Sequence, residues 1–164
     1  MNVRRVAGKG REQLEFALSN KHLSGKVGKV GWFQGAKYSD GTQVAKIAAI
    51  QEYGAPTKNI PPRPFMRPTI IQYQITWKKI AYKLSLEVIQ EKRDIANVME
   101  NLGQKAAGQI RKTISNIYIP SLKQSTIKAR LAKYANKKLV GNLYKPLIDT
   151  KHMYNTLINV VEDG

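Results

Sequence analysis

The chain has 164 residues, and its 28 lysines and arginines against 11 acidic residues give a formal net charge of +17. This length suits one domain with a core of its own, so we predict a single domain over residues 1–164. Cysteine is absent, which excludes disulfides and thiolate metal sites. No apolar run approaches the ~20 residues that cross a bilayer. We therefore expect a soluble, cytoplasmic chain with no membrane partner, whose charge favours acidic partners without determining the fold.

The N-terminal third alternates short elements. Residues 1–10 are basic and glycine-bearing, which indicates a flexible arm, and apolar residues at helical spacing predict a helix over 12–23. Residues 26–33 are β-prone and bounded by glycines. The turn chemistry of 38–42 precedes a short helix, 44–53, for which Gly54 provides a natural stop.

A proline-rich segment, Ile60–Pro68, follows this helix. Five of the 7 prolines fall within thirteen residues, at Pro56, Pro61, Pro62, Pro64 and Pro68. Because proline pushes the residue before it toward an extended conformation, Arg63 and Arg67 are predicted to be extended. A stiff, basic segment loses little entropy on docking, which suits a recognition surface. The alternative is a rigid linker that leads into the next helix, with Pro68 near its first turn.

Two long helices are predicted after the prolines. Apolar residues recur at three- and four-residue intervals from Ile70 to Val88 and again from Ile95 to Ile117. Asp94 is a candidate N-cap for the second helix. These helices form either an antiparallel pair or one bent helix packed on a sheet. Gly103 and Gly108 each weaken the second helix, which indicates close packing against a neighbour.

The C-terminal part is strongly basic. Pro120 ends the second long helix, and residues 121–146 are predicted to form an extended loop that includes a short helix capped by Ser125. Over residues 111–151 there are ten lysines or arginines and a single acid, Asp149. Residues 156–161 predict a final strand.

Nothing in the sequence favours catalysis, a cofactor or a metal. His22 and His152 are far apart and neither lies near clustered acids, so a surface or packing role is simpler for each than a ligand role. The chain contains no H-E-x-x-H, no G-x-S-x-G and no phosphate-binding loop. We therefore predict that the protein is not an enzyme, the remaining alternative being a regulatory or toxin-like enzyme with an unrecognised site.

The basic C-terminal residues allow three interpretations. Lysines and arginines interleaved with Tyr134 and Tyr144 could contact phosphates and stack on bases. They could equally form a solvated surface, or steer the chain onto an acidic protein partner. No recognised nucleic-acid-binding motif is present.

Six segments in order resemble the tail-completion (neck, head–tail joining) proteins of tailed bacteriophages. In that family a glycine-bearing strand and a turn precede a helix ending in A-x-I-x-E-[FY]-G, an I-P-x-R-P-F segment, an L-x-x-S-T-x-x-x-R stretch and a P-L-x-D-T-G signature. The matching segments here are Val27–Trp32, Ala36–Gly41, Val44–Gly54, Ile60–Phe65, Leu122–Arg130 and Pro146–Thr150. Lys151 stands where the family's last glycine is expected. Minor tail and virion-morphogenesis proteins share these motifs.

The resemblance implies an α+β fold in which a small antiparallel sheet packs against long amphipathic helices, and the residues themselves predict the extended basic loop. It also implies a virion structural protein that forms a homo-oligomeric ring at the head–tail junction and is assembled in the host cytoplasm. Its expected partners are the portal or head–tail adaptor on one side and tail tube, tail terminator or sheath proteins on the other. Contact with the phage genome is expected to be weak and non-specific at most.

Within this interpretation, residues of the proline segment and of the basic loop are expected at interfaces. Phe65 would be an aromatic anchor at a subunit contact, where Arg63 and Arg67 would bind carboxylates. The basic loop 121–146 would reach a neighbouring ring. The predicted interface residues are Arg63, Phe65, Arg67, Lys123, Lys128, Arg130 and Tyr134. The alternative function is that of a small basic nucleic-acid-binding protein.

Overall fold

A computed structural model describes residues 25–90, 93–136 and 141–164 of the chain. The predicted arm 1–10, the predicted helix 12–23 and His22 lie outside these ranges. In chain order the elements are β1 (Lys26–Gly31), α2 (Val44–Tyr53), a 3₁₀ turn (Pro56–Lys58), α3 (Met66–Ile89), α4 (Ile95–Asn116), α5 (Gln124–Tyr134), α6 (His152–Asn155) and β2 (Ile158–Asp163).

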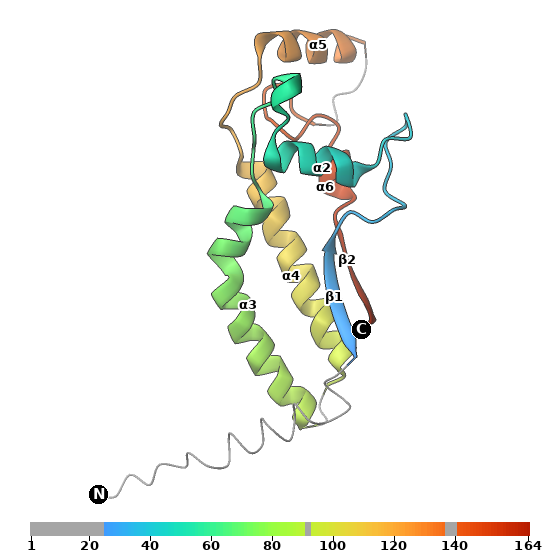
Figure 1. Cartoon of the computed structure of the whole chain (residues 1–164), viewed down its shortest axis with the longest axis vertical. Helices are drawn as coiled ribbons and strands as arrows, with labels where there is room; N and C mark the ends of the chain where they lie inside the picture. The colour runs from blue at the N-terminus through green and yellow to red at the C-terminus, as the bar shows by residue number, and fades with distance from the viewer. Residues whose placement is uncertain (1–24, 91–92, 137–140) are drawn as a thin grey trace, which may run out of the picture.

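The long helices α3 and α4 run antiparallel beside each other, and the two strands lie on the side of α4 away from α3 (Figure 1). β1 and β2 pair antiparallel, with Lys26 opposite Asp163 and Gly31 opposite Ile158. The described fold is therefore α+β, a two-stranded antiparallel sheet packed against helices, as predicted. The last strand begins two residues later than the sequence pattern indicates.

Helices α2, α5 and α6 gather at the end of the long helices where α3 begins and α4 ends (Figure 1). The main hydrophobic core lies beneath them. It is built around side chains with no exposed surface, among them Val44, Phe65, Ile114 and Leu157. The ring of Trp32 meets that of Phe65 edge-on at 5.7 Å, a favourable geometry for two aromatic rings. A smaller cluster around Val98 closes the other end.

Glycine has a packing role at one of the two predicted positions in α4. A Cβ atom at Gly103 would lie 2.7 Å from the Cβ of Asn159, so the close approach of α4 to β2 requires glycine there. At Gly108 a Cβ would meet nothing within 4 Å, and the prediction of close packing there is wrong. Asp94 is the N-cap residue of α4, as predicted, although its side chain makes no capping hydrogen bond.

The turns and helix ends of the short elements lie where the sequence predicts them. Asp40 accepts a hydrogen bond from the Thr42 amide at 2.9 Å, and Gly41 has a φ of +81°. α2 ends at Tyr53, and Gly54 takes a φ of +79° while its N–H donates to the Ile50 carbonyl. Lys151, in the position of the family's glycine, has a φ of +58°, so the left-handed turn forms here without glycine.

Within the basic stretch 121–146 the predicted short helix is present as α5, residues Gln124–Tyr134. None of the residues of α5 is buried. The helix starts one residue before Ser125, so Ser125 does not cap it; Lys123 is the N-cap residue and makes no side-chain capping bond. Among the residues that the structure describes, every helix is too short or too polar to traverse a lipid bilayer.

Candidate functional site

The proline segment is joined to α2 through the carboxylate of Glu52. One oxygen, Oε2, accepts the N–H groups of Phe65 and Met66 at 2.6 and 2.9 Å. The other, Oε1, accepts the N–H and Nε of Arg67 at 3.1 and 3.0 Å. The carboxylate therefore serves as the cap of α3, whose first N–H groups have no partner within the helix.

This arrangement determines the charge of Glu52. Burial of the side chain, which is 3% exposed, would raise its pKa. The backbone N–H donors of residues 65–67 and the Arg67 side chain outweigh burial and hold the pKa of Glu52 below its ordinary value. Glu52 is thus a buried carboxylate that stays ionised because one helix terminus and one arginine surround it.

Arg67 belongs to α3 and is not extended, contrary to the prediction from Pro68. Its Nη2 also donates to the Glu52 carbonyl at 3.1 Å, and its guanidinium stacks over the Tyr53 ring at 5.0 Å. The bonds to Glu52 outweigh the preference for extended backbone before proline. Arg67 is consequently bound within its own chain, although about half of its side chain remains exposed.

Phe65 lies in the core and has no exposed surface. An aromatic anchor for a partner needs a side chain that another molecule can reach. The expectation that Phe65 anchors a subunit contact therefore does not fit its position. The sequence pattern identified an important aromatic residue, but its hydrophobic contacts are internal, with Trp32 and the neighbouring core.

Arg63 connects the proline segment to the chain that follows α4. Its Nε donates to the Pro120 carbonyl at 2.8 Å and its Nη2 to the Ser121 carbonyl at 3.1 Å. The residue is 6% exposed. Burial, and secondarily the charge of Arg130, hold the pKa of the Arg63 guanidinium below its ordinary value. A buried cation, Arg63, and a half-buried one, Arg130, therefore lie close together in this part of the fold.

Arg130 holds the loop that follows α5. Its Nη1 donates to three carbonyls, those of Asn142 and Lys145 at 2.8 Å and that of Leu143 at 3.3 Å. Its Nε lies 3.6 Å from Asp149 Oδ1, an oxygen that is buried and accepts no hydrogen bond from the described residues. Arg130 thus ties α5, which has no buried residue, to the loop before α6.

Asp149 is also bound by the end of α5. Lys133 Nζ donates to its Oδ2 at 2.9 Å, and the Tyr134 hydroxyl donates to its backbone carbonyl at 3.4 Å. Burial would raise the pKa of Asp149, but the cations Lys133 and Arg130 with the Tyr134 hydroxyl hold it below its ordinary value. Asp149 therefore remains an anion beside the basic helix.

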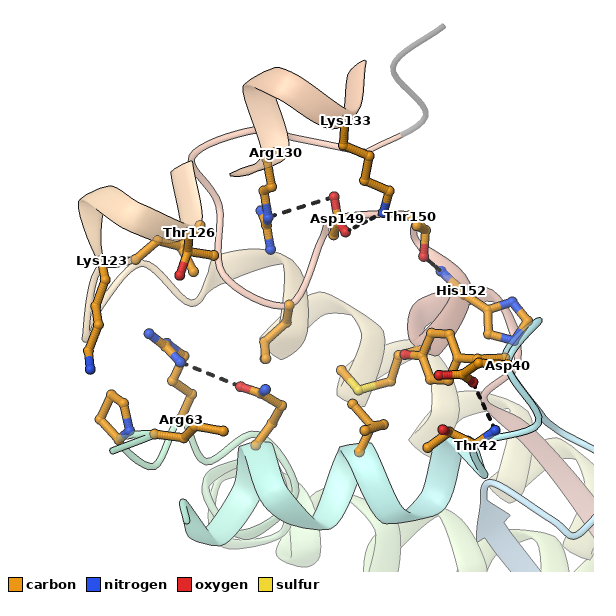
Figure 2. A pocket seen from close by; sticks show the side chains of 18 of the residues that line it. Asp40, Thr42, Arg63, Lys123, Thr126, Arg130, Lys133, Asp149, Thr150 and His152 are labelled. Carbon is orange, nitrogen blue, oxygen red and sulfur yellow. Dashed lines mark hydrogen bonds and ion pairs between the residues drawn. The ribbon is translucent and has the colours of Figure 1, made fainter. Parts of the chain in front are cut away.

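These side chains surround an open pocket of about 600 Å³ between α2, the proline segment, α5 and the turn before α6 (Figure 2). Arg63 approaches it from the proline segment, while Lys123 and Arg130 approach from the start and the middle of α5. Apolar side chains complete the wall. They are Ile47, Ile60, Pro61, Leu122, Leu147 and Met153.

The predicted interface residues therefore separate into groups. Arg63, Lys123 and Arg130 meet at the pocket, although Lys123 and Arg130 follow Arg63 by 60 and 67 positions in the sequence. Lys128 is exposed on α5 and does not line the pocket. Tyr134 lies under Lys133, whose ammonium is 5.1 Å from the ring centre.

A second surface was missed by the sequence analysis. α3 carries an apolar stripe, here called the α3 stripe, made of Ile71, Ile75, Tyr82 and Leu86, which are 70%, 64%, 58% and 37% exposed. The spacings of four, seven and four residues place them on one face of the helix. The apolar periodicity of the sequence contains the signal for this surface, because α3 has apolar residues at helical spacing on two faces. Only the face that packs on α4 is predicted from the sequence above.

His152, the histidine that the structure describes, is held by contacts within its own chain. His152 Nε2 bonds to the Lys37 carbonyl at 2.8 Å, and its ring packs against Tyr38 at 4.8 Å. Within the described ranges, no three histidine, aspartate or glutamate side chains come close enough to hold a metal ion. Comparisons with protein-family models, curated proteins and solved structures returned no match.

Proposed function

We propose that the chain is a structural virion protein of a tailed bacteriophage, a component of a ring that joins the head, through the portal or its adaptor, to the tail. The observation that carries this proposal is that the separate motif segments bind one another. Glu52 of the A-x-I-x-E-Y-G helix caps α3 at the I-P-P-R-P-F segment. These hydrogen bonds between motif segments give a physical reason why the segments occur together as a set.

The C-terminal motifs take part in the same arrangement. Arg63 of the proline segment reaches the carbonyls just before the L-K-Q-S-T stretch, and Arg130 at the end of that stretch lies beside Asp149 of the P-L-I-D-T signature. Because the motif segments contact one another, their joint occurrence supports a fold similar to that of the family. The role in the particle is then inferred from the resemblance, with the head–tail junction as the expected location.

Self-association has a candidate surface in the α3 stripe. Exposed contiguous apolar side chains are characteristic of interaction sites, and obligate oligomers bury such faces between subunits. α3 packs against α4 on one side, which leaves the stripe directed outward in the single chain. We therefore place the contact between neighbouring subunits of the ring at the α3 stripe and no longer at Phe65.

The proposal is tested in the phage that encodes the chain. Particles made without it should accumulate as separate DNA-filled heads and tails, which electron microscopy of negatively stained lysates distinguishes directly. Gold-labelled antibody should mark the head–tail junction of wild-type particles. Normally joined virions in the absence of the chain, or a purified virion that lacks it, would refute the proposed role.

The second candidate function is nucleic-acid binding, and one specific observation favours it. α5 has no buried residue, and exposed cations lie at its N-cap, Lys123, and on the helix itself, Lys128 and Lys133, the last of them paired with Asp149. Such cations are suited to phosphate contacts. Tight binding of duplex DNA at physiological salt would distinguish this function from ring assembly.

A further inference from the structure

The basic pocket has the composition of a binding site for one kind of ligand. The guanidinium of Arg63 has more N–H donors than the acceptors it meets. In the described part of the chain it makes bonds to two carbonyls and a long contact of 3.5 Å with Gln51, and no carboxylate lies within ion-pair distance. A buried arginine without an anionic partner is costly, and an incoming carboxylate would remove that cost.

The pocket is also polarised. Lys123 and Arg63 lie toward one side, and Asp40 lies toward the other (Figure 2). Arg130 and Lys133 are already paired with Asp149, and Asp40 accepts from the Thr42 amide. The uncompensated positive charge is therefore concentrated at the side of Arg63 and Lys123, next to the apolar walls.

We propose that this pocket binds an acidic residue of a peptide segment from a protein partner, with the carboxylate between Arg63 and Lys123 and flanking apolar side chains against the pocket wall. The planar fork of arginine suits the two oxygens of a carboxylate. A volume of about 600 Å³ has room for a few residues. The identity of the partner as a virion protein rests on the proposed function.

A nucleic acid fits the pocket less well. Successive phosphates of a DNA strand carry uniform negative charge, and they would meet Asp40 and Asp149, which also line the pocket. Asp149 keeps its negative charge, as described above. The apolar walls likewise offer nothing to a phosphodiester backbone, whereas a peptide with one acidic residue between apolar ones complements both parts of the lining.

The test uses the full chain and two fluorescein-labelled blocked pentapeptides, Ala-Leu-Glu-Leu-Ala and its Gln counterpart, at physiological salt. Fluorescence polarisation should show the Glu peptide binding about tenfold more tightly than the Gln peptide, because it adds a charge-assisted pair. Lys123→Gln should weaken Glu-peptide binding about threefold. Arg63→Gln should abolish the preference for Glu, provided that its circular dichroism spectrum is native.

The matched control is Lys78→Gln, an equal loss of charge on the exposed surface of α3, outside the pocket. It should leave the affinity unchanged. Equal affinities for the two peptides would overturn the proposal, and so would equal effects of Lys78→Gln and Lys123→Gln. A labelled DNA strand that binds at the pocket when the Glu peptide does not bind would also overturn it. Failure of these titrations leaves head–tail joining intact, whereas failure of the particle experiment leaves the peptide affinities as measured.

Discussion

At the scale of single residues, the main organising group is the Glu52 carboxylate. It satisfies three backbone N–H groups at the start of α3 and the side chain of Arg67 at once. Anions are stabilised at helix N-termini, and a buried charge is tolerated when it is fully hydrogen-bonded. Glu52 thereby determines where α3 begins and how the proline segment joins α2.

Glu52→Gln should therefore destabilise the fold strongly. The amide keeps the shape of the side chain but presents an N–H group and a neutral oxygen to the donors of residues 65–67. Hydrogen bonds to charged groups contribute most of this stabilisation, so we expect a loss of about 3 kcal/mol at pH 7, measured by urea denaturation. The control is Glu100→Gln on the exposed face of α4, which should change the stability by less than about 0.5 kcal/mol. Equal effects of the two substitutions would contradict this role of Glu52.

The same carboxylate predicts a pH dependence. Because the pKa of Glu52 is lowered in the folded state, its ionised form stabilises the fold above its ordinary pKa of about 4.5. That stabilisation is lost as pH falls through the lower folded pKa. The stability difference between wild type and Glu52→Gln should thus be full at pH 7 and shrink below about pH 4.5. A difference that is constant from pH 7 to pH 3 would contradict the assignment.

Sequence reasoning located these residues better than it explained them. The prolines, Arg63, Phe65 and Arg67 were recognised as a unit, because stiff backbone and unusual composition are local signals. Their partners were not recognised: Glu52 bonds to residues 13 to 15 positions away, and Arg63 bonds to carbonyls 57 and 58 positions away. Such pairings depend on the tertiary arrangement, so the sequence does not show that Arg63 and Phe65 are buried within the chain.

At the scale of elements, α3 is apolar on two faces. One face packs on α4, with Thr69 and Val88 buried and the Trp77 side chain bonded to Gln109. The other is the α3 stripe, which extends over about 22 Å from Ile71 to Leu86. Helices with apolar residues on most of their surface are normally enclosed on all sides. The stripe is consistent with a subunit that completes its packing in an oligomer.

The double substitution Ile71→Glu with Ile75→Glu should therefore weaken self-association without unfolding the chain, because both side chains are mainly exposed. Burial of one isoleucine contributes about 1.5–3 kcal/mol, so each substitution should weaken the contact about tenfold or more. Light scattering should show the oligomer, a multiple of 18.5 kDa, replaced by monomer.

The matched control for this pair is Thr76→Glu, which introduces the same acidic group at an exposed position on a different face of α3. It should leave the oligomer unchanged. A wild-type chain that remains monomeric at its highest soluble concentration, or a double variant that assembles like wild type, would show that the stripe is not the subunit contact.

The elements themselves were largely predictable. The turn 38–42, helix α2, both long helices and the final strand follow from glycine positions, turn residues and apolar periodicity, which act locally. The pairing of β1 with β2 and the burial of α4 between α3 and the sheet were left open, because they depend on contacts across the whole chain. The α3 stripe was overlooked because a periodicity test that finds one apolar face does not exclude a second.

At the scale of the whole molecule, the excess positive charge is partly committed to the fold. Every arginine that the structure describes bonds to a carbonyl or a carboxylate of its own chain: Arg63, Arg67, Arg93, Arg111 and Arg130. Arginine is the residue that binds phosphates and base edges with a planar fork. The cations most open to DNA in the described ranges are therefore lysines, which act as point charges.

This distribution predicts weak and non-specific DNA binding. We expect a dissociation constant for duplex DNA of about 10⁻⁴–10⁻⁶ M at physiological salt, with no preference among sequences and a steep loss of affinity as salt rises. Fluorescence polarisation of labelled duplexes across a salt series measures both quantities. Lys128→Gln, on the exposed face of α5, should reduce the salt dependence if that helix contacts phosphates. Nanomolar or sequence-specific affinity at physiological salt would instead favour the nucleic-acid-binding function, since counterion release from a few lysines cannot produce either property.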